Sequence, residues 1–185
     1  KNWKDGYRQD CSGYVSMAYG YGKPGFNTVG LADPSVSTKA LSVSSSITDD
    51  TWLSNYGADV VAAEDLHQFS SRGPREDGGF KPQISAPGSA ISTTPPWQPG
   101  GPVAGTYDLP PGYSQFNGTS MAAPQATGAA ALLIGAYKRL NDGERPSAAA
   151  LRTAMMSSAR FLPTADAAEQ GAGVVDVPAA WQLLK

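Results

Sequence analysis

Cysteine and histidine are almost absent from this sequence, whose 185 residues include one Cys and one His. A single cysteine excludes a disulfide within the chain. With only one histidine beside it, no Cys/His cluster can hold zinc, haem or an iron–sulfur group. We therefore expect no metal site and no cofactor. Any catalysis must depend on hydroxyl groups, carboxylates, or the single Cys11 or His67.

An excess of charge and a long hydrophobic run are also absent. Lys and Arg number 14 against 16 Asp and Glu, for a net charge of −2, so the chain has no basic footprint for nucleic acid or an anionic membrane. The longest apolar stretch, residues 121–137, is interrupted by Pro124, Gln125 and Thr127. The first ten residues are polar and lack the apolar run of a signal peptide. We therefore expect neither a nucleic-acid partner nor a membrane partner.

Short apolar runs separated by turn residues predict an α/β fold with a parallel sheet. The expected strands cover residues 39–47, 60–63, 83–86, 90–93 and 173–177. The expected helices cover residues 11–19, 120–140, 147–159 (with Ser147 as N-cap) and 178–184. Residues 94–113 are rich in Pro and Gly and predict an ordered loop. The helix at 120–140 is apolar nearly all round, which predicts a helix buried within a domain.

One serine lies where a nucleophile could be activated. The run Asn117-Gly118-Thr119-Ser120-Met121-Ala122-Ala123-Pro124 places Ser120 in the first turn of the long predicted helix. Free N–H groups and the positive end of the helix dipole would stabilise an oxyanion beside its oxygen. On position alone, an N-cap role for Ser120 is the commoner interpretation.

Three motifs favour the interpretation of Ser120 as a nucleophile. The run ending in Pro124 resembles the nucleophile motif of the subtilisin-like serine proteases, and the order of that family is completed by Phe69-Ser70-Ser71-Arg72-Gly73-Pro74 and Lys81-Pro82-Gln83-Ile84-Ser85-Ala86-Pro87-Gly88. The resemblance covers about residues 24–185, the carboxy-terminal half of such a domain. It implies an α/β fold with a partial parallel sheet, a buried central helix starting at Ser120, and secretion. It also implies a peptide or protein substrate, hydrolysed through an acyl-enzyme on Ser120 with its backbone N–H as oxyanion donor.

The rest of the family's catalytic pattern is missing. Its triad arrives in the order Asp, His, Ser, whereas His67 lies two residues before Phe69 and lacks the expected surroundings of a base. We therefore expect His67 to be an ordinary loop or surface side chain. None of the candidate aspartates has the sequence context of the family's catalytic Asp; these are Asp33, Asp49, Asp59 and Asp108. Tyr21 occupies the place of the Asn that supplies the family's second oxyanion donor. We expect the isolated chain to be inactive unless a complementing amino-terminal fragment supplies the missing groups.

The amino terminus has a different resemblance. The run Tyr7-Arg8-Gln9-Asp10-Cys11-Ser12-Gly13-Tyr14-Val15-Ser16-Met17-Ala18 resembles the nucleophile segment of NlpC-type cysteine peptidases, which cut amides in bacterial cell walls. A helix N-terminus would lower the pKa of the Cys11 thiol. Residues 1–23 are thus predicted to be foreign to the protease pattern of residues 24–185, as in a chimera.

Three hypotheses follow. The chain is an incomplete serine endopeptidase using Ser120, a non-catalytic fragment in which Ser120 only caps a helix, or a cell-wall amidase using Cys11 with His67 as base. In the first two cases, half of a parallel sheet leaves an open strand edge and an uncovered face on the central helix.

Overall fold

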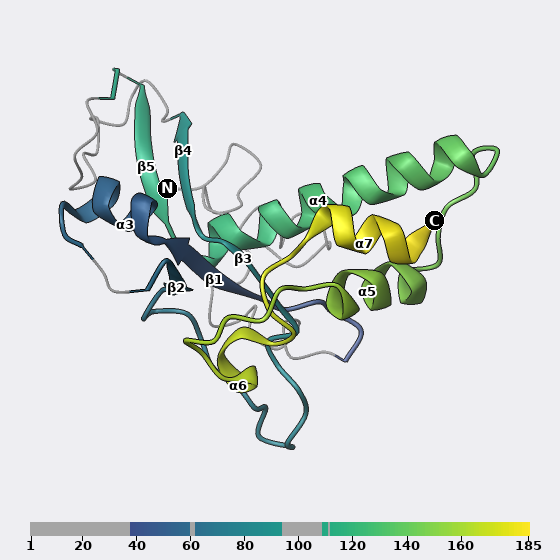
Figure 1. Ribbon diagram of the computed structural model, residues 1–185, viewed down its shortest axis with the longest axis horizontal. Coiled ribbons are helices and arrows are strands. Elements are labelled where there is room, and N and C mark those ends of the chain that lie inside the picture. The colour runs from purple at the N-terminus through teal and green to yellow at the C-terminus, as the bar shows by residue number, and fades with distance from the viewer. Residues whose placement is uncertain (1–37, 60–61, 94–108, 111) are drawn as a thin grey trace, which may run out of the picture. The chain divides into compact units, whose positions relative to one another are not determined.

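The computed structural model describes residues 38–59, 62–93, 109–110 and 112–185 (Figure 1). The chain divides into two units, Lys1–Ala40 and Leu41–Lys185, and every element described below belongs to the second. This unit is α/β, with strands and helices interleaved along the chain, as the sequence predicted. The predicted helix at residues 11–19 lies outside the described residues.

The central sheet has strand order β2-β1-β3 and is built around β1 (Val43–Thr48). β1 runs parallel to β3 (Ile84–Pro87) and antiparallel to the short β2 (Glu64–Leu66). The parallel pair confirms the predicted architecture. Two other predicted strands are wrong. Residues 62–63 are not extended and the strand begins at Glu64, while residues 173–177 contribute only isolated bridges at Val174.

A second, two-stranded sheet precedes the longest helix. It pairs β4 (Ser89–Thr93) with β5 (Tyr113–Asn117) in antiparallel register, so that Ser89 lies opposite Asn117. Figure 1 shows these strands side by side, leading back to the start of α4. The predicted loop at 94–113 therefore ends where β5 begins; its residues 94–108 and 111 lie outside the described part.

Five helices are described: α3 (Asp49–Tyr56), α4 (Thr119–Leu140), α5 (Ala148–Ser157), α6 (Ala167–Gln170) and α7 (Val177–Leu184). Ser147 caps α5 as predicted, because its side chain accepts the N–H of Ala150 at 3.1 Å. The sequence analysis missed α3 and α6. Both are short and depend on polar caps, Thr48 for α3 and a reciprocal Asp166–Glu169 capping box for α6.

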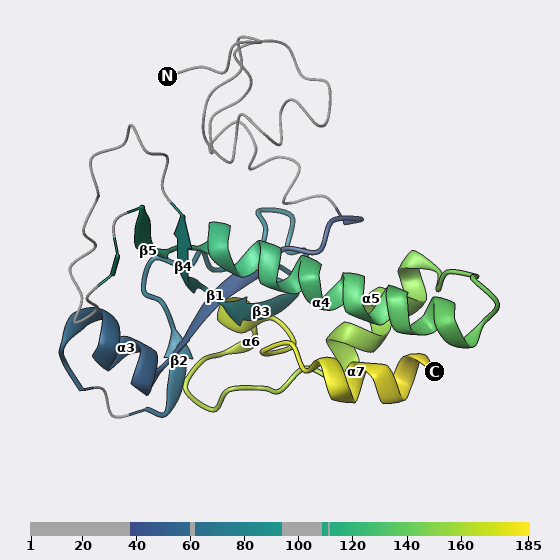
Figure 2. The ribbon, with the colours of Figure 1, turned by 90° about the horizontal axis from the view of Figure 1, so that it is seen from above.

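The hydrophobic core lies between α4, the sheet and the two carboxy-terminal helices. Figure 2 shows α4 running along β1 and β3, with α5 and α7 beside its carboxy-terminal half. Ala129 and Leu133 of α4 are buried against Ile84, Met155 and Ala180. The helix also has an uncovered face, as expected for half of a parallel sheet, because Leu132 is 67% exposed while its neighbour Leu133 is 1% exposed. Among residues 41–59, 62–93, 109–110 and 112–185, the other elements pack on one face of α4.

Candidate active site

The candidate nucleophile follows a tight connection from strand to helix. β5 ends at Asn117, Gly118 is the N-cap of α4, and Ser120 is the second residue of the helix. Gly118 donates its N–H to the carbonyl of Gly88 at 2.8 Å, which ties the turn to the end of β3. The side chain of Ser120 makes no cap hydrogen bond, and Ser120 is exposed. The interpretation of Ser120 as a helix cap is therefore wrong.

The amide donors of the first helical turn surround Ser120. Met121 and Ala122 both donate to the Gly118 carbonyl, at 2.9 and 3.3 Å. Among the described residues, no acceptor bonds the amide N–H of Ser120. The amide N–H of Ser120 is therefore an unused donor at the positive end of a 22-residue helix, on the same residue as the hydroxyl. If the Ser120 oxygen attacked a carbonyl carbon, the oxyanion formed on the carbonyl oxygen could meet this donor.

A pocket of about 320 Å³ opens beside Ser120. The first turns of α4 form one wall of this pocket and the two-stranded sheet forms the other. It is lined by Ala90, Ser92, Phe116, Ser120, Met121, Pro124 and Gln125. Its walls carry no charged side chain, so it suits an uncharged, largely apolar group held next to the hydroxyl.

A buried amide network holds the residue before the turn. The side-chain oxygen of Asn117 accepts from Ser89 Oγ at 2.6 Å, Gln115 Nε2 at 3.1 Å and Asn55 Nδ2 at 3.2 Å. Its Nδ2 donates to the Tyr56 hydroxyl at 2.8 Å. Asn55 on α3 is fully buried. The network thus anchors the nucleophile turn to α3 and to both strands of the hairpin.

The sequence analysis did not find this network. One local signal was present, because Gln115 and Asn117 are two residues apart and so share one face of a strand. The contribution of α3 had no local signal. Asn55 lies 62 residues before its partner Asn117, in a helix that the apolar pattern did not predict.

His67 is buried, not a surface side chain as expected. It follows β2 and is 2% exposed, stacked on Phe69 with ring centroids 4.5 Å apart. Its Nδ1 is 2.8 Å from the Ser45 hydroxyl, and its Nε2 is buried without a hydrogen-bond partner. Burial lowers the pKa of the imidazole, a shift that a hydrogen bond with the Ser45 backbone partly opposes. His67 is thus a neutral core side chain.

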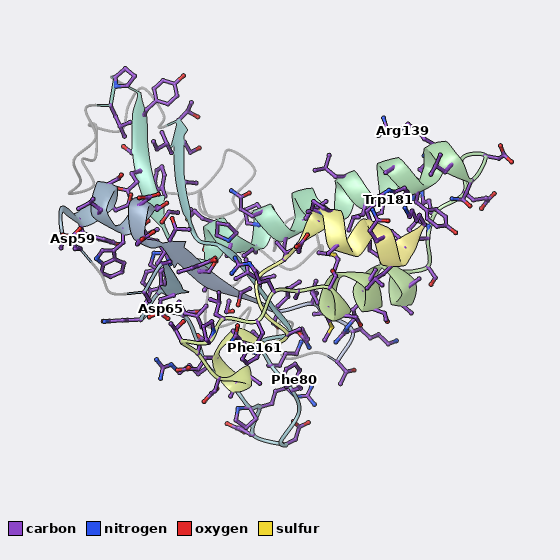
Figure 3. All side chains as sticks on the ribbon, in the orientation of Figure 1. Asp59, Asp65, Phe80, Arg139, Phe161 and Trp181 are labelled. Atoms are coloured by element: carbon purple, nitrogen blue, oxygen red, sulfur yellow. The ribbon has the colours of Figure 1, made fainter. Side chains whose placement is uncertain are left out.

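The described part of the chain brings no base within hydrogen-bonding distance of the Ser120 hydroxyl. Among the described residues, neither a carboxylate nor a nitrogen of His67 is hydrogen-bonded to its hydroxyl. Asp49 lies in the first turn of α3, and Figure 3 shows Asp59 at the outer side of α3. Cys11, Tyr21, Asp33 and Asp108 lie outside the described residues. The triad that the resemblance requires is therefore not assembled from the described part of the chain.

The described segments contain no group of three or more His, Cys, Asp or Glu side chains that could hold a metal ion. None of their helices is long and apolar enough to cross a bilayer.

A parallel strand pair, a long helix packed on it, and an exposed serine at the start of that helix form the α/β arrangement that the resemblance to serine proteases implies. More particularly, the chain belongs to the subtilase family, whose model matches residues 15–173. The match begins inside the 1–23 segment and leaves out Cys11.

The relatives are much longer proteins. Pyrolysin of Pyrococcus furiosus is 31% identical over 191 residues, covering 91% of this chain and 12% of its own length. Tripeptidyl-peptidase 2 of Caenorhabditis elegans is 27% identical, covering 92% of this chain and 11% of its own. A lanthipeptide protease of known structure has a TM-score of 0.59 at 23% identity, covering 86% of this chain and 47% of its own. At 23% identity, the similarity to the lanthipeptide protease shows the fold alone. The chain thus spans about one eighth of these curated relatives and about half of a solved domain.

Proposed function

We propose that this chain is the nucleophile-bearing half of a serine endopeptidase, and that Ser120 is the nucleophile. The observation that carries the proposal is the position of Ser120. Its hydroxyl is exposed at the start of a 22-residue helix, beside an unused amide donor and a pocket of about 320 Å³. The substrate is a peptide or protein, and the extracellular location in the proposal comes from the family resemblance.

The chemistry is acyl transfer. The Ser120 oxygen would attack a peptide carbonyl carbon while a base accepts its proton, and the Ser120 amide would stabilise the oxyanion. The C–N bond then breaks, the amine leaves with the proton, and water hydrolyses the ester on Ser120. The pocket would hold a substrate side chain next to the scissile bond.

The proposal includes a complementing amino-terminal half that supplies Asp and His. Without a working triad, residual catalysis over water is only about 10³–10⁴-fold even when the oxyanion site is complete. His67 does not fill the role of base, because it is buried and its Nδ1 is bonded to Ser45. The same burial gives no support to a Cys11–His67 amidase.

A fluorophosphonate probe followed by peptide mapping tests the assignment. We expect labelling at Ser120 when the amino-terminal half of the pyrolysin peptidase domain is added, and very slow labelling in its absence. Ser120→Ala should abolish the labelling. Ser147→Ala is the matched control, because Ser147 is also an exposed serine at a helix start but caps α5. A folded, complemented sample without label at Ser120 would leave the non-catalytic fragment as the function.

A further inference from the structure

Three side chains donate to the same oxygen just before the turn that carries Ser120. Asn117 Oδ1 accepts hydrogen bonds from Asn55, Gln115 and Ser89. Both amide donors are buried, Asn55 at 0% and Gln115 at 2% exposure. An amide oxygen has two lone pairs, so a third donor adds little hydrogen-bond energy. The stability of the fold alone therefore does not account for this arrangement.

The two amide donors leave their own carbonyl groups unpaired. Among the described residues, Asn55 Oδ1 and Gln115 Oε1 are buried without a hydrogen-bond partner, and burial of an unpaired carbonyl lowers stability. The equally buried amide of Gln170 has both of its ends bonded. It accepts one backbone N–H at 2.7 Å and donates to two backbone carbonyls at 2.8 and 2.6 Å. Asn55 and Gln115 thus face Asn117 at an energetic cost that Gln170 does not have.

The turn that follows Asn117 has no capping side chain. Gly118 is the N-cap of α4 and makes no side-chain cap hydrogen bond. The first helical turn closes where Met121 and Ala122 donate to the Gly118 carbonyl, and Ser120 lies within this turn. The position of the Ser120 hydroxyl and amide N–H therefore depends on how firmly the backbone at Asn117 is held.

Asn55 connects this turn to a different part of the fold. Gln115 and Ser89 belong to the same two-stranded sheet as Asn117 and would move with it. Asn55 belongs to α3, which begins directly after β1 of the central sheet and lies beside the hairpin where β5 leads into α4 (Figure 1). Tyr56, its neighbour on α3, accepts from Asn117 Nδ2 at 2.8 Å. α3 thus holds both ends of the Asn117 side-chain amide from outside the hairpin.

We propose that Asn55 is a positioning residue for Ser120. Its amide fixes the backbone at Asn117 relative to the central sheet, so that the Ser120 hydroxyl and amide N–H keep one orientation. The inference rests on the proposed function of Ser120, and Asn55 acts through Asn117 and not on the reacting atoms themselves. A small displacement of a reacting group slows a reaction strongly. Active sites often retain groups that lower stability, which explains the two unpaired carbonyls.

Asn55→Leu tests whether the contact serves stability. The change removes the donor and its unpaired carbonyl together, and Asn117 Oδ1 keeps its bonds from Gln115 and Ser89. We therefore expect only a small change in the thermal midpoint of the chain. Gln170→Leu is the control, because it deprives one backbone N–H and two carbonyls of their partner and should lower the midpoint much more. A larger loss for Asn55→Leu than for Gln170→Leu would make Asn55 a structural residue and overturn the inference.

Amide hydrogen exchange reports on the turn without the need for peptidase activity. The amides of Met121 and Ala122 report on the first turn of α4, and the amide of Leu133 reports on its buried part. By nuclear magnetic resonance, we expect Asn55→Leu to speed exchange at the first two by about fivefold or more relative to Leu133. Gln115→Leu removes the same kind of donor from within the hairpin and should change this ratio less than about twofold.

The reactivity of Ser120 provides the second measurement. In the complemented sample, fluorophosphonate labelling per folded chain should slow by about tenfold in Asn55→Leu and by less than about twofold in Gln115→Leu. Ser120→Ala defines the background. A purely structural role for Asn55 would reduce the folded fraction and leave the labelling rate per folded chain unchanged.

The outcomes separate this inference from the proposed function. Slower labelling in Asn55→Leu supports the positioning role. An unchanged labelling rate, or equal effects of Asn55→Leu and Gln115→Leu, would overturn it. A wild type without label at Ser120 overturns the nucleophile, and exchange then decides the role of Asn55 in the turn: faster exchange in Asn55→Leu supports that role, and unchanged exchange overturns it.

Discussion

Ser45 and Ser120 each have some of the features that a catalytic serine needs, but they have different ones. Ser45 has a histidine at 2.8 Å but is completely buried, and its histidine is 2% exposed. Ser120 has solvent access, an unused amide donor and a pocket, but no base among the described residues. A hydrogen-bonded Ser–His pair is therefore not evidence of catalysis. Access and an oxyanion donor distinguish the site, and the base can come from another segment.

The two serines are nevertheless connected through one residue. Gly88 follows β3 and accepts the N–H of Gly118, the cap of the helix that carries Ser120. A Cβ at Gly88 would lie 1.6 Å from the Ser45 hydroxyl and 3.2 Å from the Gly118 carbonyl oxygen. Gly88 thus lies between the buried Ser45 side chain and the turn that leads to the exposed Ser120.

Gly88→Ala should break this arrangement and have the largest effect. We expect it to lower the free energy of unfolding by about 3 kcal/mol, because the added methyl group has no room beside Ser45. Urea denaturation measures the loss. Gly135→Ala is the control, since its Cβ meets nothing within 4 Å. Combining Gly88→Ala with Ser45→Gly should recover part of the stability, and an unchanged loss would show that the clash is not with Ser45.

Asn117→Ala should weaken the support of the exposed serine. It leaves Asn55, Gln115 and Ser89 without their shared acceptor, and unsatisfied buried polar groups cost about 1–3 kcal/mol. We expect a loss of about 2 kcal/mol in urea denaturation. Asn141→Ala, which removes one bond to the Tyr137 carbonyl at the end of α4, should cost less than about 1 kcal/mol. Equal losses would mean that the network does not act as a unit.

Replacing each serine by alanine compares the two sites directly. Ser45→Ala leaves His67 Nδ1 without its partner and should lower the free energy of unfolding by about 1–2 kcal/mol. Ser120→Ala should change it by less than about 0.5 kcal/mol, because the side chain is exposed and caps nothing. Thermal unfolding of both variants measures the difference. A larger loss for Ser120→Ala would reverse the assignment of structural and functional serine.

The pH dependence of the free energy of unfolding should identify His67 as a core residue that is neutral when folded. Of the effects predicted here, this one should be the smallest. Burial lowers its pKa in the folded state, so the unfolded chain binds the proton more readily. His67 therefore does not reduce the free energy of unfolding above the unfolded pKa of about 6.5. As the pH falls below this value, the free energy of unfolding decreases. The loss attributable to His67 between pH 7.5 and 6 should be below about 1 kcal/mol.

His67→Phe isolates this contribution, because phenylalanine keeps the stack with Phe69 and does not titrate. Urea denaturation of both proteins at pH 7.5, 6.0 and 5.0 should show the wild type losing stability faster than the variant on acidification. Parallel decreases would show that His67 does not contribute to the pH dependence.

The motifs around the nucleophile could be read from the sequence because they are local. The helix predicted at 120–140 is α4 (Thr119–Leu140), and the predicted cap Ser147 is the cap observed. Strands on both sides of Pro87-Gly88 were predicted within a residue or two. Each of these depends on neighbours within a few positions, such as a cap, a turn pair or an apolar period.

Burial was predicted less well. Neither the burial of His67 nor that of Asn55 has a local signal, since each is covered by segments distant in the sequence. The sequence predicted an uncovered face on α4 but not the residues that line it, whereas the structure leaves Leu132 exposed and buries Leu133.

The sequence by itself determined the family, the helix that begins before Ser120, and the cap of the helix that follows it. The reason is that capping, periodicity and motif spacing act over short stretches of chain. Only the tertiary structure decided which serine is accessible, that the histidine is bonded to Ser45, and which residues line the open apolar face of α4. Solvent access depends on what distant segments cover, and no local pattern of residues contains that information.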